Sequence, residues 1–160
     1  MNIIKNPENL KVIERVIVSG LIFSADGYIL MGEKDPSKGG VYANATHIPG
    51  GGVEEGESKE EAFVREISEE TGLDIKGLTL ELVDDLGRGE TEKTVNGEKV
   101  WCMMQFNIYK VQLDRKADDI VLHPTDDLPV LKWVDPKDLK TINLTQPSVE
   151  LFKRIGMIEP

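Results

Sequence analysis

The chain has 160 residues, 39% of them hydrophobic and 30% charged, which is the length and composition of one folded domain spanning residues 1–160. Its formal net charge of −10 argues against a protein that binds DNA or RNA through the phosphate backbone. The sequence has no apolar run long enough for a membrane span or a signal peptide, and its single cysteine, Cys102, cannot form an internal disulfide, so we expect a cytoplasmic protein in which Cys102 is a buried small hydrophobe.

The amino-terminal part of the chain predicts a β-hairpin. Residues 11–23 are rich in β-branched side chains and indicate a strand. Asp26-Gly27 is a turn signal, and residues 28–33 are expected to return as the second strand. Residues 35–40 have the composition of a loop.

A helix is predicted over residues 58–71. Ser58 is a favourable N-cap, and Glu61, three residues later, completes a capping box. Gly72 stands where a helix of this length would stop. These three residues define both ends of the predicted helix.

The carboxyl-terminal half predicts three strands and a closing helix. Asn96-Gly97 is a hairpin turn signal, and residues 114–127 form a polar, acidic loop. The expected elements are strands at 77–86, 100–113 and 130–134 and a helix that begins at Pro147 and ends near Ile155. Mixed strands flanked by two helices indicate an α/β or α+β sandwich.

Acidic residues concentrate in and before the first predicted helix. From Gly51 to Leu73 there are eight acids and two bases, so −6 of the net −10 lies in this segment. On a helical wheel, Glu66, Glu69 and Glu70 share one arc beside the apolar face. A solvated helix face is the usual interpretation of such a run. Like charges at these spacings weaken a helix, however, and a hard divalent cation such as Mg²⁺ would relieve their repulsion.

The same segment resembles the signature of the Nudix hydrolase family. Gly51, Glu57 and the run Arg65-Glu66-Ile67-Ser68-Glu69-Glu70-Thr71-Gly72-Leu73 match every fixed position of that signature. The residues leading in, from His47 to Gly51, and the run from Trp133 to Pro136 are also similar to the family. The resemblance implies a Nudix-like α/β/α sandwich with a mixed β-sheet between helices. It also implies Mg²⁺- or Mn²⁺-dependent hydrolysis of a nucleoside diphosphate linked to another moiety, X.

By position in the signature, the resemblance implies a metal site. Glu66, Glu69 and Glu70 would supply carboxylate ligands, and Gly50 would supply a backbone carbonyl ligand. The ion expected there is Mg²⁺ or Mn²⁺, because both bind oxygen ligands.

Further roles in catalysis follow from the same resemblance. Arg65 would orient a ligand carboxylate, and Glu57 would support the site from a greater distance. The general base would be Glu69 or Glu70. In some family members the base is instead a glutamate of a later loop, and Asp127 stands at that position here.

Several residues are candidates for contacts with the substrate. Arg15, on the first predicted strand, would meet a phosphate or be an ordinary charge at a sheet edge, and Gly51 would permit close approach of a ligand. Four side chains would stack on a base or lie in the core: Tyr42, His47, Trp101 and Phe106.

The region downstream of the signature narrows the substrate by elimination. Gly89, Glu90 and Thr91 stand where ADP-ribose hydrolases usually have a proline and dinucleoside polyphosphate hydrolases a tyrosine. The remaining preference is a nucleoside triphosphate or a related small nucleotide. A nucleotide-sugar hydrolase and a Nudix-fold module that binds or senses a nucleotide without turnover stay open as alternatives. Homodimers are common in the family, so a homodimer stays open as well.

Overall fold

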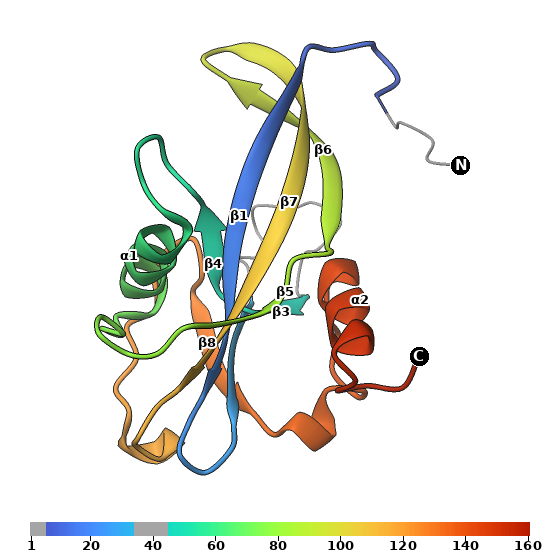
Figure 1. Cartoon of the computed structure of the whole chain (residues 1–160). Helices are drawn as coiled ribbons and strands as arrows, with labels where there is room; N and C mark the ends of the chain where they lie inside the picture. The colour runs from blue at the N-terminus through green and yellow to red at the C-terminus, as the bar shows by residue number, and fades with distance from the viewer. Residues whose placement is uncertain (1–5, 34–44) are drawn as a thin grey trace.

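The structure is a computed structural model that describes residues 6–33 and 45–160. One mixed sheet lies at its centre, with helix α1 (Lys59–Thr71) on one face and helix α2 (Gln146–Arg154) on the other (Figure 1). The strands are β1 (Val12–Phe23), β2 (Ile29–Glu33), β3 (Thr46–His47), β4 (Gly50–Gly52), β5 (Glu81–Asp84), β6 (Arg88–Val95), β7 (Glu98–Gln112) and β8 (Val130–Val134). This arrangement confirms the predicted sandwich.

The parallel pair of β1 and β7 forms the middle of the sheet. The two strands pair from Val12 opposite Trp101 to Phe23 opposite Gln112. Successive side chains of a strand point to opposite faces, so each of these strands contributes to two apolar clusters, one under each helix. This explains why their sequences are apolar without a clean alternation. Cys102 is buried and free, as expected.

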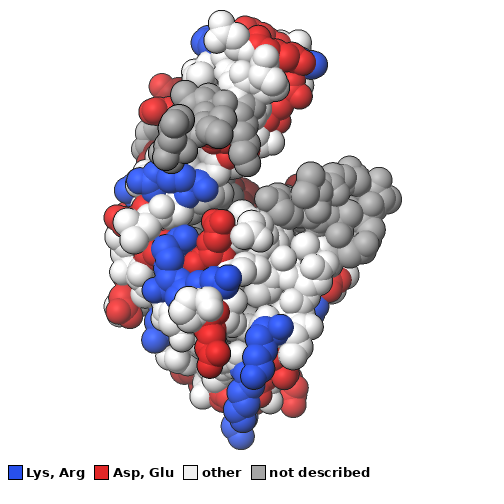
Figure 2. Space-filling view, turned by 90° about the vertical axis from the view of Figure 1, so that its right-hand side faces the viewer, with Lys and Arg blue, Asp and Glu red and all other residues white. Residues whose placement is uncertain are grey.

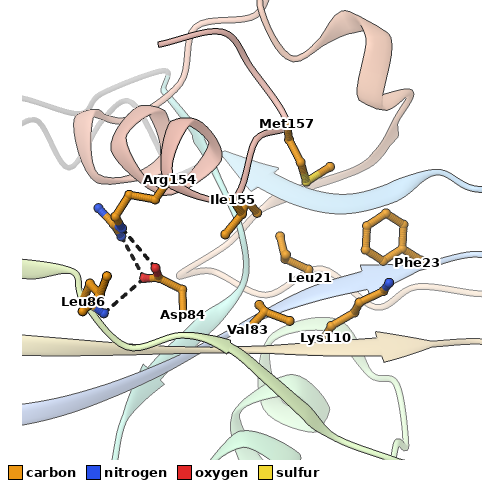
Figure 3. Close-up of a pocket in the computed structure, with 9 residues that line it drawn as sticks. All are labelled: Leu21, Phe23, Val83, Asp84, Leu86, Lys110, Arg154, Ile155 and Met157. Atoms are coloured by element: carbon orange, nitrogen blue, oxygen red, sulfur yellow. Dashed lines mark hydrogen bonds and ion pairs between the residues drawn. The ribbon is translucent and has the colours of Figure 1, made fainter.

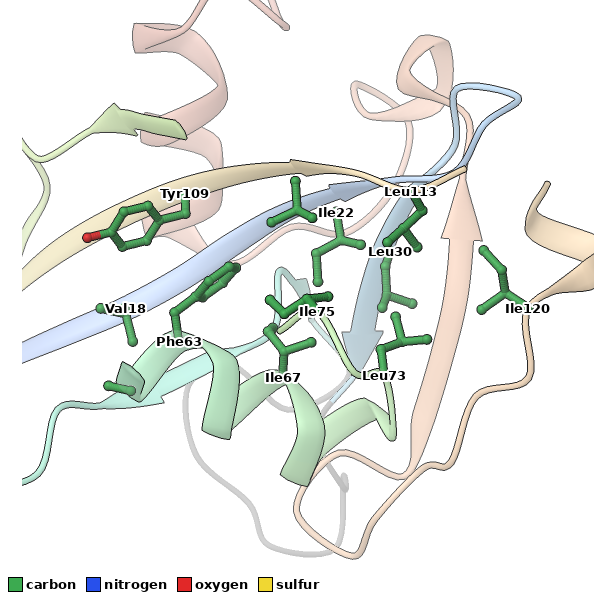
Figure 4. Packing of buried hydrophobic residues seen from close by; sticks show 12 residues of the cluster. Val18, Ile22, Leu30, Phe63, Ile67, Leu73, Ile75, Tyr109, Leu113 and Ile120 are labelled. Atoms are coloured by element: carbon green, nitrogen blue, oxygen red, sulfur yellow. The ribbon is translucent and has the colours of Figure 1, made fainter. Parts of the chain in front are cut away.

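Helix α1 has the predicted ends. The Ser58 hydroxyl accepts from the Glu61 backbone N–H, the Glu61 carboxylate accepts from the Ser58 N–H, and Gly72 ends the helix in the left-handed conformation. Phe63 and Ile67 are fully buried against the sheet, as Figure 4 shows. The apolar stripe therefore fixes which face of α1 is left for its carboxylates.

The prediction for residues 77–86 was partly wrong. Only Glu81–Asp84 are in a strand, and Gly77 has a positive φ of +84°. The next strand, β6, was not predicted because it is polar and mostly exposed at the sheet edge. Its pairing is set by the predicted Asn96-Gly97 turn, which places Val95 opposite Glu98. The short strands β3 and β4 were also not predicted, because two or three residues carry no alternating pattern.

The remaining elements agree with the sequence. The acidic loop contains one short 3₁₀ turn (Ala117–Asp119), β8 has the predicted bounds, and a second 3₁₀ turn (Pro136–Asp138) precedes α2. Pro147 lies in the first turn of α2. Within the described ranges, no helix combines the length and the apolar character needed to cross a membrane.

Candidate active site

The glycine strand β4 forms the floor of the site. It runs antiparallel to β1, with Gly50, Gly51 and Gly52 opposite Ser19, Val18 and Ile17. A Cβ added to Gly51 would collide with the carboxylate of Glu66, so this carboxylate lies directly on the glycine backbone. Any other residue at position 51 would push it away. The structure therefore brings Glu66 and Gly51 together.

Arg65 is the centre of an ion-pair network beside β4. Its Nε and Nη2 donate to the two oxygens of Glu57 at 2.7 and 2.9 Å. Its Nη1 donates to Glu66 Oε1 at 2.9 Å and to Glu69 Oε2 at 3.2 Å. Nη2 also donates to the Gly52 carbonyl at 3.0 Å. One guanidinium thus joins the loop, the strand and two carboxylates of the helix.

The network shifts the pKa values of its members. Hydrogen bonds from Arg65 and from the Glu54 backbone lower the pKa of Glu57 from its ordinary 4.5 to about 2. The pKa of Arg65 is raised, mainly by its hydrogen bonds to Glu57. Glu57 is therefore ionised over the whole physiological pH range, which keeps the orientation of Arg65 fixed.

Glu70 makes a separate contact with β4. Its Oε1 accepts the backbone N–H of Gly50 at 3.1 Å. Glu66 and Glu70 thus contact the glycine strand directly, and Glu69 is linked to it through Arg65. Of the two helix carboxylates that pair with Arg65, that of Glu69 is the more exposed: its side chain is 59% exposed, whereas the side chain of Glu66 is 15% exposed.

The donor set has the chemistry of a site for a hard divalent cation. It offers carboxylate oxygens from one helix and glycine carbonyls from a facing strand, and Glu66 lies in a space that a Cβ would fill. Among the described residues, no group of three or more His, Cys, Asp or Glu is gathered closely enough to hold an ion. Arg65 and the Gly50 N–H bond to carboxylates that a cation would need.

Arg15 lies on the other side of the same strand. A Cβ on Gly52 would collide with its guanidinium, so Arg15 covers Gly52 as closely as Glu66 covers Gly51. In the described chain, Arg15 has no ion-pair partner. Arg15 is therefore a cation beside the carboxylate site. Gly52 thus contacts both Arg65, through its carbonyl, and Arg15. This pair of contacts was not predicted, and its only signal in the sequence is the run of three glycines.

The other candidate residues have different outcomes. His47 is in β3, partly buried, with its Nδ1 2.8 Å from the Ile48 carbonyl oxygen. Asp127 is exposed in the loop before β8. Trp101 is buried, and Phe106 is partly buried beside the α2 cluster. Tyr42 lies outside the described residues. The roles proposed for these side chains in binding or proton transfer stay predictions.

A pocket of about 670 Å³ lies on the α2 side of the sheet, away from the carboxylates. At one end of it, Arg154 of α2 forms a bidentate ion pair with Asp84 of β5, at 3.1 and 2.9 Å (Figure 3). Asp84 is buried and also accepts the Leu86 N–H. The pair fastens the end of α2 to the sheet. On the face that carries α2, the visible acidic and basic side chains are interspersed (Figure 2).

Comparisons with known proteins agree with this architecture. A family model described as the NUDIX domain matches residues 14–155. No curated protein matches the sequence.

Solved structures with the same fold share little sequence with the chain. The MutT protein from Methanosarcina mazei Go1 is 19% identical with a TM-score of 0.65, over 92% of this chain and 96% of that one. A Nudix hydrolase from M. smegmatis is 14% identical with a TM-score of 0.65, and the match covers 89% of this chain and 83% of that one. The dihydroneopterin triphosphate pyrophosphohydrolase of E. coli is 19% identical with a TM-score of 0.60, over 87% and 92%. At these identities the likeness shows the fold.

Proposed function

The chain belongs to the Nudix family of nucleotide pyrophosphohydrolases, and we propose that it hydrolyses nucleoside triphosphates or a related small nucleotide with Mg²⁺ or Mn²⁺ bound. One observation carries this proposal. The carboxylates of α1 and the cation Arg15 converge on the same three-residue glycine strand from its two sides. Carboxylates suit a divalent cation and Arg15 suits a phosphate, so a metal-bound polyphosphate matches both.

The chemistry requires water to attack phosphorus and a bridging P–O bond to break, which releases a nucleotide and phosphorylated X. Nudix hydrolases generally use divalent metal ions, which neutralise diphosphate oxygens and lower the pKa of bound water. Glu66, Glu69 and Glu70 would hold the ion, together with the Gly50 carbonyl.

Other groups of the chain prepare the carboxylates for this reaction. Arg65, itself fixed by Glu57, orients Glu66 through the 2.9 Å hydrogen bond. Glu69 or Glu70 accepts the proton of the attacking water. Asp127 is the second candidate for that proton.

The preference for a triphosphate rests on two supports besides elimination from the sequence. The E. coli structural neighbour is named for its action on dihydroneopterin triphosphate, which is a small molecule with a triphosphate chain. The net charge of −10 also favours a small substrate over a nucleic-acid polymer. We further infer a single domain over residues 1–160 and a cytoplasmic location.

The proposal is tested by a hydrolysis screen with Mg²⁺ or Mn²⁺ over nucleoside triphosphates, nucleotide sugars, ADP-ribose and dinucleoside polyphosphates. Running the reactions in ¹⁸O-water and identifying products by mass shows which phosphorus receives the oxygen. We expect turnover of a triphosphate. Turnover confined to nucleotide sugars would replace the substrate class.

Silence across the panel, with nucleotide bound and the protein folded, would favour a binding module instead. The observation that favours this second function is that Arg65 already bonds to Glu66 and Glu69, two of the proposed metal ligands. A Mg²⁺ or Mn²⁺ titration of the same sample then shows whether these carboxylates are released to the ion.

A further inference from the structure

The loop between the first 3₁₀ turn and β8 is attached to the end of α1. The backbone N–H of His123 donates to the Thr71 carbonyl at 2.8 Å. Thr71 is the last residue of α1 and follows Glu70 directly. The ring of His123 covers Gly72, where an added Cβ would lie 2.5 Å from Cδ2. The loop thus binds one of the carbonyls that a helix leaves unpaired at its end.

A second attachment fixes the same loop to strand β2. Leu128 is fully buried, and a Cβ on Gly32 would lie 2.6 to 2.8 Å from its side-chain carbons. Gly32 is paired with His47 in β3, which lies three residues before Gly50. The second attachment is therefore on β2, the strand paired with β3, and β3 leads along the chain to the glycine strand of the site.

The residues between the two attachments form a closed turn. The backbone N–H of Thr125 donates to the Leu128 carbonyl at 3.3 Å, and the Leu128 N–H donates to the Thr125 carbonyl at 3.2 Å. The Thr125 hydroxyl also accepts the Leu128 N–H, at 3.3 Å. Asp126 and Asp127 lie inside this turn and are exposed. Buried Leu128 and the bonded Thr125 therefore restrict where the two carboxylates can go.

These contacts close a circuit that includes the site. Glu70 bonds to Gly50, and β3, which precedes Gly50, pairs with β2. Leu128 of the loop packs on Gly32 of β2. The loop also bonds to Thr71 of α1, the residue after Glu70. Figure 1 shows this loop, in orange, passing beside α1 before it enters β8. The turn cannot move far without breaking one of these contacts.

We propose that Leu128 and His123 are positioning residues that hold the turn containing Asp127 beside the Glu70 end of α1. This inference rests on the proposed function and adds that the loop is docked before substrate arrives. The alternative is that the two residues only stabilise the loop. The two cases differ in whether the loss of kcat caused by truncating Leu128 depends on the presence of Asp127.

A double-mutant cycle separates them. We compare Leu128→Ala, Asp127→Asn and the double variant, with Leu139→Ala as a control, because Leu139 is equally buried but lies in the cluster under α2. Both leucine variants should lower the melting temperature. Only Leu128→Ala should lower kcat, by about three- to tenfold, and it should add almost nothing when Asp127 is already Asn. KM should change little in either case.

Amide hydrogen exchange gives a readout independent of turnover. Leu128→Ala should accelerate exchange of the His123 N–H, and Leu139→Ala should not. Three results would overturn the inference. Leu128→Ala could keep the wild-type kcat, or it could lower kcat as much in the Asp127→Asn background as in the wild type. Leu139→Ala could also lower kcat as much as Leu128→Ala does. A wild type with no turnover would instead refute the proposed function and the catalytic role of the turn, while the exchange rates would still decide whether the loop is docked.

Discussion

Gly51→Ala tests whether Glu66 acts where the structure places it. The added Cβ would lie 2.5 Å from Glu66 Oε1, whereas ordinary contacts begin at 3.4 Å. The carboxylate must therefore retreat by about 1 Å, and a displacement of this size can cost about a hundredfold in rate. That factor corresponds to about 2.7 kcal/mol of transition-state stabilisation. The free energy of unfolding should fall by less than about 1 kcal/mol, since the end of a flexible side chain can move.

The matched control is Gly56→Ala, in the loop before α1. Gly56 has φ of +79° and nothing within 4 Å of an added Cβ. Its substitution strains the backbone by about 1 kcal/mol but leaves Glu66 in place. Steady-state kinetics on the substrate found in the screen, together with thermal unfolding, should give opposite profiles: Gly51→Ala stable and slow, Gly56→Ala less stable and fast. Wild-type kcat in Gly51→Ala, or an equal loss of kcat in both variants, would refute the assignment of Glu66.

The other predictions concern the ionised network and Tyr109. Glu70→Gln keeps an oxygen for the Gly50 N–H but loses the charge, so turnover should fall by orders of magnitude with almost no change in melting temperature; a near-normal rate with saturating Mg²⁺ would contradict the site. Arg65→Lys keeps the charge but not the planar fork that binds Glu57, so chemical denaturation should show a loss of about 1 kcal/mol. The pKa of Glu57 is about 2 in the folded protein instead of 4.5. The stability that ionised Glu57 contributes is therefore complete above pH 4.5 and is lost as the pH falls toward 2. Glu57→Gln should remove this pH dependence from the acid unfolding curve. Burial, then the charge of Glu60 and a hydrogen bond to it, raise the pKa of Tyr109 from 10.0 to about 12, so the stability that it contributes should be lost between these pH values, and Tyr109→Phe should flatten the alkaline unfolding curve.

Helix α1 could be predicted from the sequence because its signals are local. Ser58 and Glu61 bond to each other's backbone within one turn, and Gly72 ends the helix by its own conformation. The spacing of Glu66 and Glu69 relative to Arg65 likewise follows from helix geometry, and both contacts are present. Local rules of this kind need no knowledge of the rest of the chain.

Contacts made across the fold could not be predicted in the same way. The strongest partner of Arg65 is Glu57, which reaches it only through the conformation of the loop before α1. Gly52 contacts both Arg65 and Arg15 because β4 pairs with β1, and nothing in three consecutive glycines identifies that pairing. Strand β6 was missed for a related reason, since its polar residues gain their order from pairing with β7 and not from burial.

The glycines at positions 51 and 52 of β4 follow from where the charges lie, whereas a Cβ at Gly50 would collide with the Val18 carbonyl oxygen and with Ser19 of β1. In the described chain β4 pairs only with β1, and its other edge faces α1, where the Gly50 N–H bonds to Glu70 and the Gly52 carbonyl bonds to Arg65. Glu66 lies on Gly51 on the side of α1, and Arg15 lies on Gly52 on the opposite side of the strand. In the proposed reaction, a polyphosphate held by Arg15 would therefore have to span this strand to reach an ion held by the carboxylates of α1. Side chains at positions 51 and 52 would displace Glu66 and Arg15, which are the groups proposed to bind the cation and the phosphate, so both positions require a bare backbone.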